Sequence, residues 1–169
     1  MMKRISTRLL VLAATLCLGA CGIYSFSGIS IQPDIKTVTL NYFEYKALKM
    51  NPNLSNNLTE ALRTEFRKMT RLEQVEMDGD IEITGEITGY DVTMAAVTAN
   101  EVAARNKLTV TIKIAFTNRL YPEDDFEKSF SQFAEYDSTN PLDAVESSLC
   151  EEIVKKLVED IMNATVANW

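Results

Sequence analysis

Polar and apolar residues alternate in four segments of this chain, which is the pattern of strands with one buried face. The clearest alternation lies at 105–119, and its apolar face consists of Leu108, Val110, Ile112, Ile114 and Phe116. The opposite face carries Thr109, Thr111, Lys113 and Thr117. We therefore expect a strand here whose apolar side packs against the core and whose other side meets water.

Three further strands are predicted at 37–45, 81–94 and 126–136. The first places Val38, Leu40 and Tyr42 on one face. The last places Phe126, Phe130 and Tyr136 on one face and Phe133 on the other. In 81–94 the apolar positions change parity after Gly89, and a phase change at a glycine indicates a β-bulge. The small and weakly polar residues between 94 and 105 predict a hairpin tip.

Two helices are predicted from apolar residues at spacings of three and four. The first begins at Asn51-Pro52, with Asn as the N-cap and Pro at the first helical position. Its stripe comprises Leu54, Leu58, Ala61, Leu62, Phe66 and Met69. The second follows Asn140-Pro141 and runs from Leu142 to Val166.

The predicted order is β-α-β-β-β-α. Each amphipathic helix needs an apolar partner, and the predicted sheet offers one apolar face. We therefore expect an α+β protein. Its architecture would be a two-layer α/β sandwich, with a four-stranded, mostly antiparallel sheet and both helices on one face.

The N-terminal segment has the pattern of an export signal. Lys3, Arg4 and Arg8 precede a twelve-residue apolar run, which is shorter than the roughly 20 residues of a membrane span. The run ends in Leu18-Gly19-Ala20-Cys21, which resembles the lipobox of bacterial lipoproteins, where the cysteine thiol is acylated and the chain is cut on the N-terminal side of that cysteine. The alternatives are an ordinary signal peptide or an uncleaved anchor. We expect a removed signal peptide at 1–20, a lipidated tether at 21–36 and a single domain at 37–169.

Composition excludes several classes of function. Loss of residues 1–20 changes the formal net charge from −7 to −10, and so acidic a chain is a poor binder of nucleic acid. The sequence contains no His, which excludes His-based nucleophile pairs and His-containing metal sites. Cys150 lies in a helical pattern and is expected to be a buried structural thiol. We predict no catalytic residues, no metal and no cofactor.

Several stretches, taken in order, resemble the LptE family in its Bacteroidota-type version. They are CGIYSFSG, NPNLSNNLTEALRTEF, ITGEITGYDV, NKLTVTIKIAFTN, SFSQFAEYD and EEIVKKLVEDIMNATVANW. The resemblance implies the same α/β sandwich. It also implies a lipoprotein that plugs an outer-membrane β-barrel and helps it place lipopolysaccharide in the outer leaflet. The expected partners are therefore the barrel, lipopolysaccharide and a membrane, and the expected location is the periplasmic side of the outer membrane.

Four basic residues share the polar face of the segment at 105–119, namely Arg105, Lys107, Lys113 and Arg119. One interpretation is contact with lipid phosphates or with acidic groups of the barrel lumen, because guanidinium and ammonium groups bind such anions. The other is an ordinary polar surface, in which Glu82 and Glu86 pair with Lys113 or Arg119 across the hairpin.

Two other functions stay open from the sequence. A lipid-carrying or lipid-sensing lipoprotein acting alone would need an apolar cavity between helices and sheet. A lipoprotein enzyme would need clustered carboxylates in a cleft, and the sequence offers no such constellation.

Overall fold

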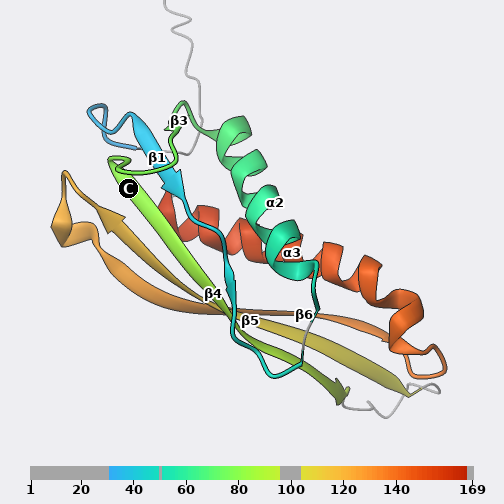
Figure 1. Cartoon of the computed structure of the whole chain (residues 1–169). Coiled ribbons are helices and arrows are strands. Elements are labelled where there is room, and N and C mark those ends of the chain that lie inside the picture. The colour runs from blue at the N-terminus through green and yellow to red at the C-terminus, as the bar shows by residue number, and fades with distance from the viewer. Residues whose placement is uncertain (1–30, 50, 96–103, 167–169) are drawn as a thin grey trace, which may run out of the picture.

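The computed structural model describes residues 31–49, 51–95 and 104–166. Within them, one mixed sheet forms the first layer and two helices form the second (Figure 1). The sheet contains β1 (Thr37–Leu40), β2 (Glu44–Tyr45), β3 (Glu73–Gln74), β4 (Ile81–Met94), β5 (Arg105–Asn118) and β6 (Phe126–Asp137). The helices are α2 (Leu54–Met69) and α3 (Leu142–Thr165), and a short 3₁₀ turn, η1, covers Pro122–Asp124.

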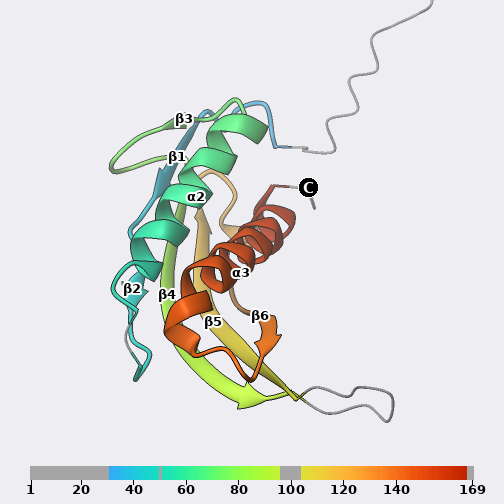
Figure 2. The ribbon, with the colours of Figure 1, turned by 90° about the vertical axis from the view of Figure 1, so that its right-hand side faces the viewer.

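The α+β class and the two-layer arrangement are confirmed, with both helices on the same side of the sheet (Figure 2). The strand count is six rather than four among the described residues. The strand order is β3-β1-β4-β5-β6, and β2 also pairs with β4. The long pairings β4–β5 and β5–β6 are antiparallel. The pairings of β1 with β3, of β1 with β4 and of β2 with β4 are parallel.

The predicted strand at 37–45 is two strands, because the alternation breaks between them. Leu40 pairs with Ile83 and Glu44 with Glu86, so the β1–β2 segment carries one residue more than β4 over this stretch. The extra residue reverses the faces. Phe43 is therefore buried, while Tyr42, which we expected beside Val38 and Leu40, is 54% exposed.

The parity change at Gly89 is confirmed as a bulge. The β4–β5 register shifts between Ile87 and Gly89, and the buried positions of β4 change from Ile87 to Tyr90. The two strands then stay paired to Met94 and Asn106. The predicted hairpin tip lies largely outside the described residues.

Helix α2 begins at Leu54, later than the Asn-Pro signal predicted. The Asn51 side chain instead accepts a hydrogen bond from the backbone N–H of Asn53, at 3.0 Å, and so closes a turn ahead of the helix. Helix α3 begins at Leu142 as expected.

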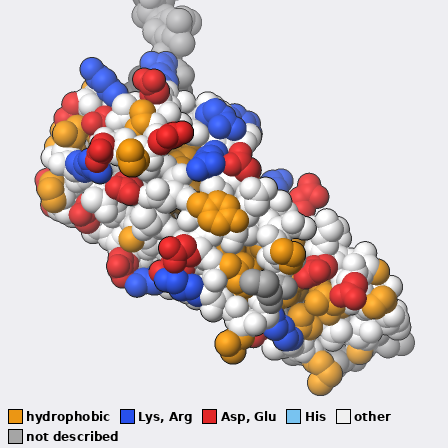
Figure 3. All heavy atoms as spheres, viewed as in Figure 1, with side chains coloured by type: hydrophobic (Ala, Val, Ile, Leu, Met, Phe, Trp, Pro, Cys, Tyr) orange, Lys and Arg blue, Asp and Glu red, His pale blue; other side chains and the backbone are white. Residues whose placement is uncertain are grey.

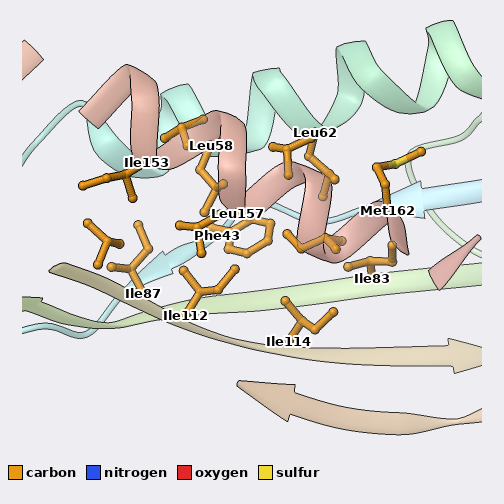
Figure 4. Close-up of a cluster of buried hydrophobic side chains, with 14 of the residues drawn as sticks. Phe43, Leu58, Leu62, Ile83, Ile87, Ile112, Ile114, Ile153, Leu157 and Met162 are labelled. Atoms are coloured by element: carbon orange, nitrogen blue, oxygen red, sulfur yellow. The ribbon is translucent and has the colours of Figure 1, made fainter. Parts of the chain in front are cut away.

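The core fills the space between the two layers. Ile83, Ile87, Ile112 and Ile114 rise from the sheet toward Leu58, Leu62 and Leu157 of the helices, and the Phe43 ring lies among them (Figure 4). Ile112 is fully buried and Ile114 is 1% exposed, so the predicted faces of β5 are confirmed. Neither of the described helices covers the opposite face of the sheet, which we call the outer face.

Candidate functional site

The outer face carries all four basic residues that the sequence singled out. Lys113 is exposed and Lys107 is half-buried, both on the side of β5 away from the helices, and the exposed Arg119 directly follows the last residue of that strand. Arg105 stands at the start of the same strand. β5 and the residue that follows it thus carry all four side chains, but they do not gather them into a compact cluster.

Three of these cations form ion pairs. The distance between Lys113 Nζ and Glu127 Oε2 is 2.6 Å, and Arg105 reaches Glu135 at 3.5 Å. Arg119 contacts Asp78 at 2.7 Å and Glu82 at 3.5 Å. The pairing of Arg119 with Glu82, which we left open from the sequence, is therefore present.

The neighbouring carboxylates act on the basic groups electrostatically. The hydrogen bond to Glu127 raises the pKa of the Lys113 ammonium, and the hydrogen bond to Asp78 raises the pKa of the Arg119 guanidinium. Glu86, the other expected partner, contacts Lys46 instead. This part of the outer face is a mosaic of opposite charges rather than a positive stripe, and Figure 3 shows the same mixing around β1 and the upper part of β4.

Lys107 differs from the other three cations because its neighbour is aromatic. Its Nζ lies 5.1 Å from the centre of the Phe133 ring, within the range of a cation–π contact. Phe133 stands on β6 at the edge of the sheet, and 45% of it is exposed, as its predicted outward position requires. Lys156 of α3 approaches the same ring at 5.8 Å and donates a hydrogen bond to the Phe133 carbonyl.

A depression of about 530 Å³ lies in the outer face where β2, β4 and β5 run side by side. Its floor is formed by Thr84 and Ala115, which face each other across the β4–β5 ladder. Tyr42 and Asn41 line one side, and Glu127 lies on the other. The alternation of polar and apolar residues does not predict this depression. The one available signal was the pair of adjacent aromatic residues at 42 and 43, since only one of them can face the core.

A second depression, of about 810 Å³, follows the groove between α2 and α3. Ala61, Val154 and Val158 supply its apolar part. Its charged residues are Glu60, Glu65, Lys68, Glu151, Glu152, Lys155 and Glu159. The rim is therefore mostly acidic and open to solvent.

Cys150 is buried, as predicted, beside a small polar cluster that the sequence did not reveal. The Tyr90 hydroxyl donates a hydrogen bond to Glu146, and the Asn51 amide donates to the same carboxylate at 3.1 Å. The Asn51 amide also lies 3.7 Å from the Cys150 sulfur. Burial raises the pKa of the Cys150 thiol, which suits a structural role rather than a reactive one.

The described residues offer neither a metal site nor a membrane-spanning helix. No group of three or more Cys, Asp and Glu side chains in this part of the chain is arranged to hold a metal ion. Neither described helix is long and apolar enough to cross a bilayer. The predicted attachment point, Cys21, lies outside the described residues.

Comparison with known proteins gives one matching family model and several solved structures that superpose on this chain in part. The model of the LptE family, described as lipopolysaccharide-assembly, matches residues 35–165. No curated protein matches the sequence.

Among solved structures, a neuraminyllactose-binding hemagglutinin homolog from Helicobacter pylori has a TM-score of 0.50 and 11% identity, covering 77% of this chain and 82% of its own. A minor lipoprotein from Acinetobacter baumannii has a TM-score of 0.46 and 11% identity, covering 72% of this chain and 91% of its own. The rare lipoprotein B from Shewanella oneidensis has a TM-score of 0.41 and 10% identity, and the match covers 73% of this chain and 95% of the other. At these identities the comparison concerns the fold alone.

Proposed function

Because the chain belongs to the LptE family of lipopolysaccharide-assembly proteins, we propose that it is a lipid-anchored subunit of an outer-membrane β-barrel translocon. It plugs the barrel and assists its assembly, and the pair inserts lipopolysaccharide into the outer leaflet. The observation that carries this proposal is the extent of the family match, which runs from just before β1 to the last residue of α3. The role is non-enzymatic.

The outer face is the surface that we assign to the barrel lumen. It spans the three longest strands, and the side chains of β5 there are mostly threonines and paired cations. Burying an unpaired charge is costly, whereas hydroxyls and charges that already have partners can be covered by a polar wall. The outer face therefore suits a polar protein surface better than an apolar one.

Anchoring at Cys21 completes the proposal. Acyl chains on this residue would hold the protein at the periplasmic side of the outer membrane, since each buried CH₂ group contributes about 0.8 kcal/mol. The acidic chain itself would be repelled by anionic lipid heads.

Site-specific photo-crosslinking tests the orientation. A photoreactive amino acid placed at Thr111 on the outer face should crosslink to the barrel in intact cells. The same group at Lys155, on the helix groove, is the control for a surface turned away from that contact. Strong crosslinking from Lys155 with none from Thr111 would show that the opposite layer faces the barrel. Absence of the barrel from detergent-solubilised complexes of the full chain would contradict the proposal as a whole.

A stand-alone lipid carrier is less well supported. Such a protein needs an apolar cavity, but the space between the layers is packed with side chains such as Phe43, Leu58 and Ile112. Both depressions described above are open surface features with charged residues around them. Lipid that stays bound to the purified chain in the absence of the barrel would favour the carrier.

A further inference from the structure

The depression in the outer face combines an aromatic wall with a rim of polar groups. Tyr42 projects from the break between β1 and β2, with 54% of its surface exposed. The floor of the depression is formed by Thr84 and Ala115, two small side chains on directly paired residues of β4 and β5. The volume of about 530 Å³ falls within the range of about 300–1,000 Å³ that is usual for small-molecule sites.

The polar groups of the rim are held in place by one another. The Asn41 amide donates to Glu82 at 2.7 Å, and Lys113 pairs with Glu127 at 2.6 Å. Lys46 bridges Glu44 and Glu86 at the end of β2. Each carboxylate has several lone pairs and each ammonium has three donors, so these groups can form additional hydrogen bonds with a ligand. These side chains are partly exposed, so a ligand in the depression can reach them.

The charge of the rim selects among ligands. Glu44, Glu86 and Glu127 line the depression together with a single cation, Lys113. Lys46 neutralises part of this charge from outside the lining, and the sum remains negative. Phosphate and other anions are therefore disfavoured.

A neutral saccharide has the matching chemistry. One face of a pyranose ring presents C–H groups that can lie on an aromatic ring, and its hydroxyls both donate and accept hydrogen bonds. We propose that the depression between Tyr42 and Glu127 binds an uncharged sugar residue. The ring would stack on Tyr42, and its hydroxyls would bond to Asn41, Glu86 and the Lys113–Glu127 pair. The binding of a sugar is argued from the residues of the depression alone. That the sugar comes from the glycan part of lipopolysaccharide rests on the proposed function.

Saturation-transfer NMR on the full mature chain tests the site directly. The protein is kept in a polyoxyethylene detergent, because a sugar-headed detergent would compete. Glucose, N-acetylglucosamine and inorganic phosphate are the first probes. We expect transfer to the ring protons of the sugars, with dissociation constants on the order of 1–10 mM for a single residue. We expect no competition by phosphate. Displacement of the sugars by phosphate, or no transfer to any sugar, would overturn the proposal.

Three variants locate the binding. Tyr42→Ala should weaken it by roughly 3- to 10-fold, while Tyr42→Phe should keep it, because stacking needs the ring and not the hydroxyl. Ala115→Leu should abolish binding by filling the floor. Phe133→Ala is the matched control, since Phe133 is also an exposed aromatic residue of the outer face but lies outside the depression. Equal loss in Tyr42→Ala and Phe133→Ala, or unchanged binding in Ala115→Leu, would place the sugar elsewhere.

Two further probes identify the source of the sugar. One is the oligosaccharide released from the cells' own lipopolysaccharide, and the other is glycan released from the cell wall. Binding of either supports the site, and the tighter one names the source. Recovery of the barrel with the unaltered chain tests the proposed function, whereas the NMR titration of the purified chain tests the sugar site alone, so the two failures can be told apart.

Discussion

A single close contact, between Phe43 and Gly85, shapes the inner face of β4. A Cβ atom added at Gly85 would lie 2.1 Å from the Phe43 ring, and that ring is fully buried. We predict that Gly85→Ala lowers the free energy of unfolding by about 1–3 kcal/mol, because the packed core cannot move the ring aside freely. Denaturant unfolding measures the effect.

Phe43→Leu should relieve the clash of Gly85→Ala. The double variant should therefore be more stable than the sum of the two single changes predicts. Gly89→Ala is the control, since its Cβ would lie 3.1 Å from the Thr111 side chain, a tight contact that a shift of a few tenths of an ångström would relieve. If the two changes have additive effects on the free energy of unfolding, the Phe43 ring is not what prevents a larger residue at position 85.

Asp80 makes stability depend on pH. Its carboxylate accepts hydrogen bonds from the backbone N–H groups of Lys36, at 2.8 Å, and Thr37, at 2.9 Å. These bonds, that from Lys36 foremost, lower the pKa of Asp80. A lowered pKa in the folded state stabilises the protein above the unfolded-state pKa, and the contribution is lost as pH falls through the folded-state value.

We therefore predict that Asp80→Asn costs about 1 kcal/mol at neutral pH, since a charge-assisted hydrogen bond becomes a neutral one. The difference from the wild type should shrink as the pH falls below about 4, the usual pKa of an aspartate. Thermal unfolding at several pH values measures it. A constant difference from pH 7 to pH 3 would mean that the charge of Asp80 plays no part.

At the scale of elements, the sequence predicted regular features well and irregular ones poorly. The faces of β5 follow from strict alternation, and the apolar stripes of both helices from spacings of three and four. Met69, which we expected in the stripe of α2, is an exception, because it is the last residue of the helix and is 47% exposed. Strands β2 and β3 have two residues each, which is too short for any period. The depression was not predictable because its walls come from strands far apart in the chain, and Tyr42 reaches it only through the break at the end of β1.

The outer face of β5 provides a prediction at this scale. Lys113→Glu combined with Arg119→Glu removes two sets of exposed ion pairs and places like charges beside Glu127 and Glu82. Exposed pairs contribute little to stability, so we expect an intact fold and only a small loss of stability. Under the proposed function, the yield of co-purified barrel should fall clearly.

Lys49→Glu combined with Arg71→Glu is the matched control. It changes the net charge equally at exposed positions away from β5, and it should leave barrel recovery unchanged. Normal recovery in a folded Lys113→Glu, Arg119→Glu variant would show that the basic residues of the outer face are only surface.

At the scale of the whole molecule, the predicted anchor determines where the protein resides. Cys21→Ser removes the thiol that acylation requires, so we expect the variant in the soluble fraction or as an unprocessed precursor. Fractionation and labelling with a radioactive or clickable fatty acid measure the outcome. Normal labelling and membrane retention would refute the lipobox interpretation. Protease sensitivity on intact cells would contradict the periplasmic orientation.

The parallel pairing of β1 with β4 sets the order in which the protein can form. Val38 pairs with Ile81, and Phe43 packs where Gly85 leaves room, so the first strand has no partner in β4 until the chain has passed residue 81. Contacts so distant along the chain close late in folding. A chain that emerges from its N-terminus, from a ribosome or through a membrane channel, therefore has β1 without its β4 partner until residue 81 has followed. The acylation that we propose at Cys21 can thus precede the joining of β1 to the sheet.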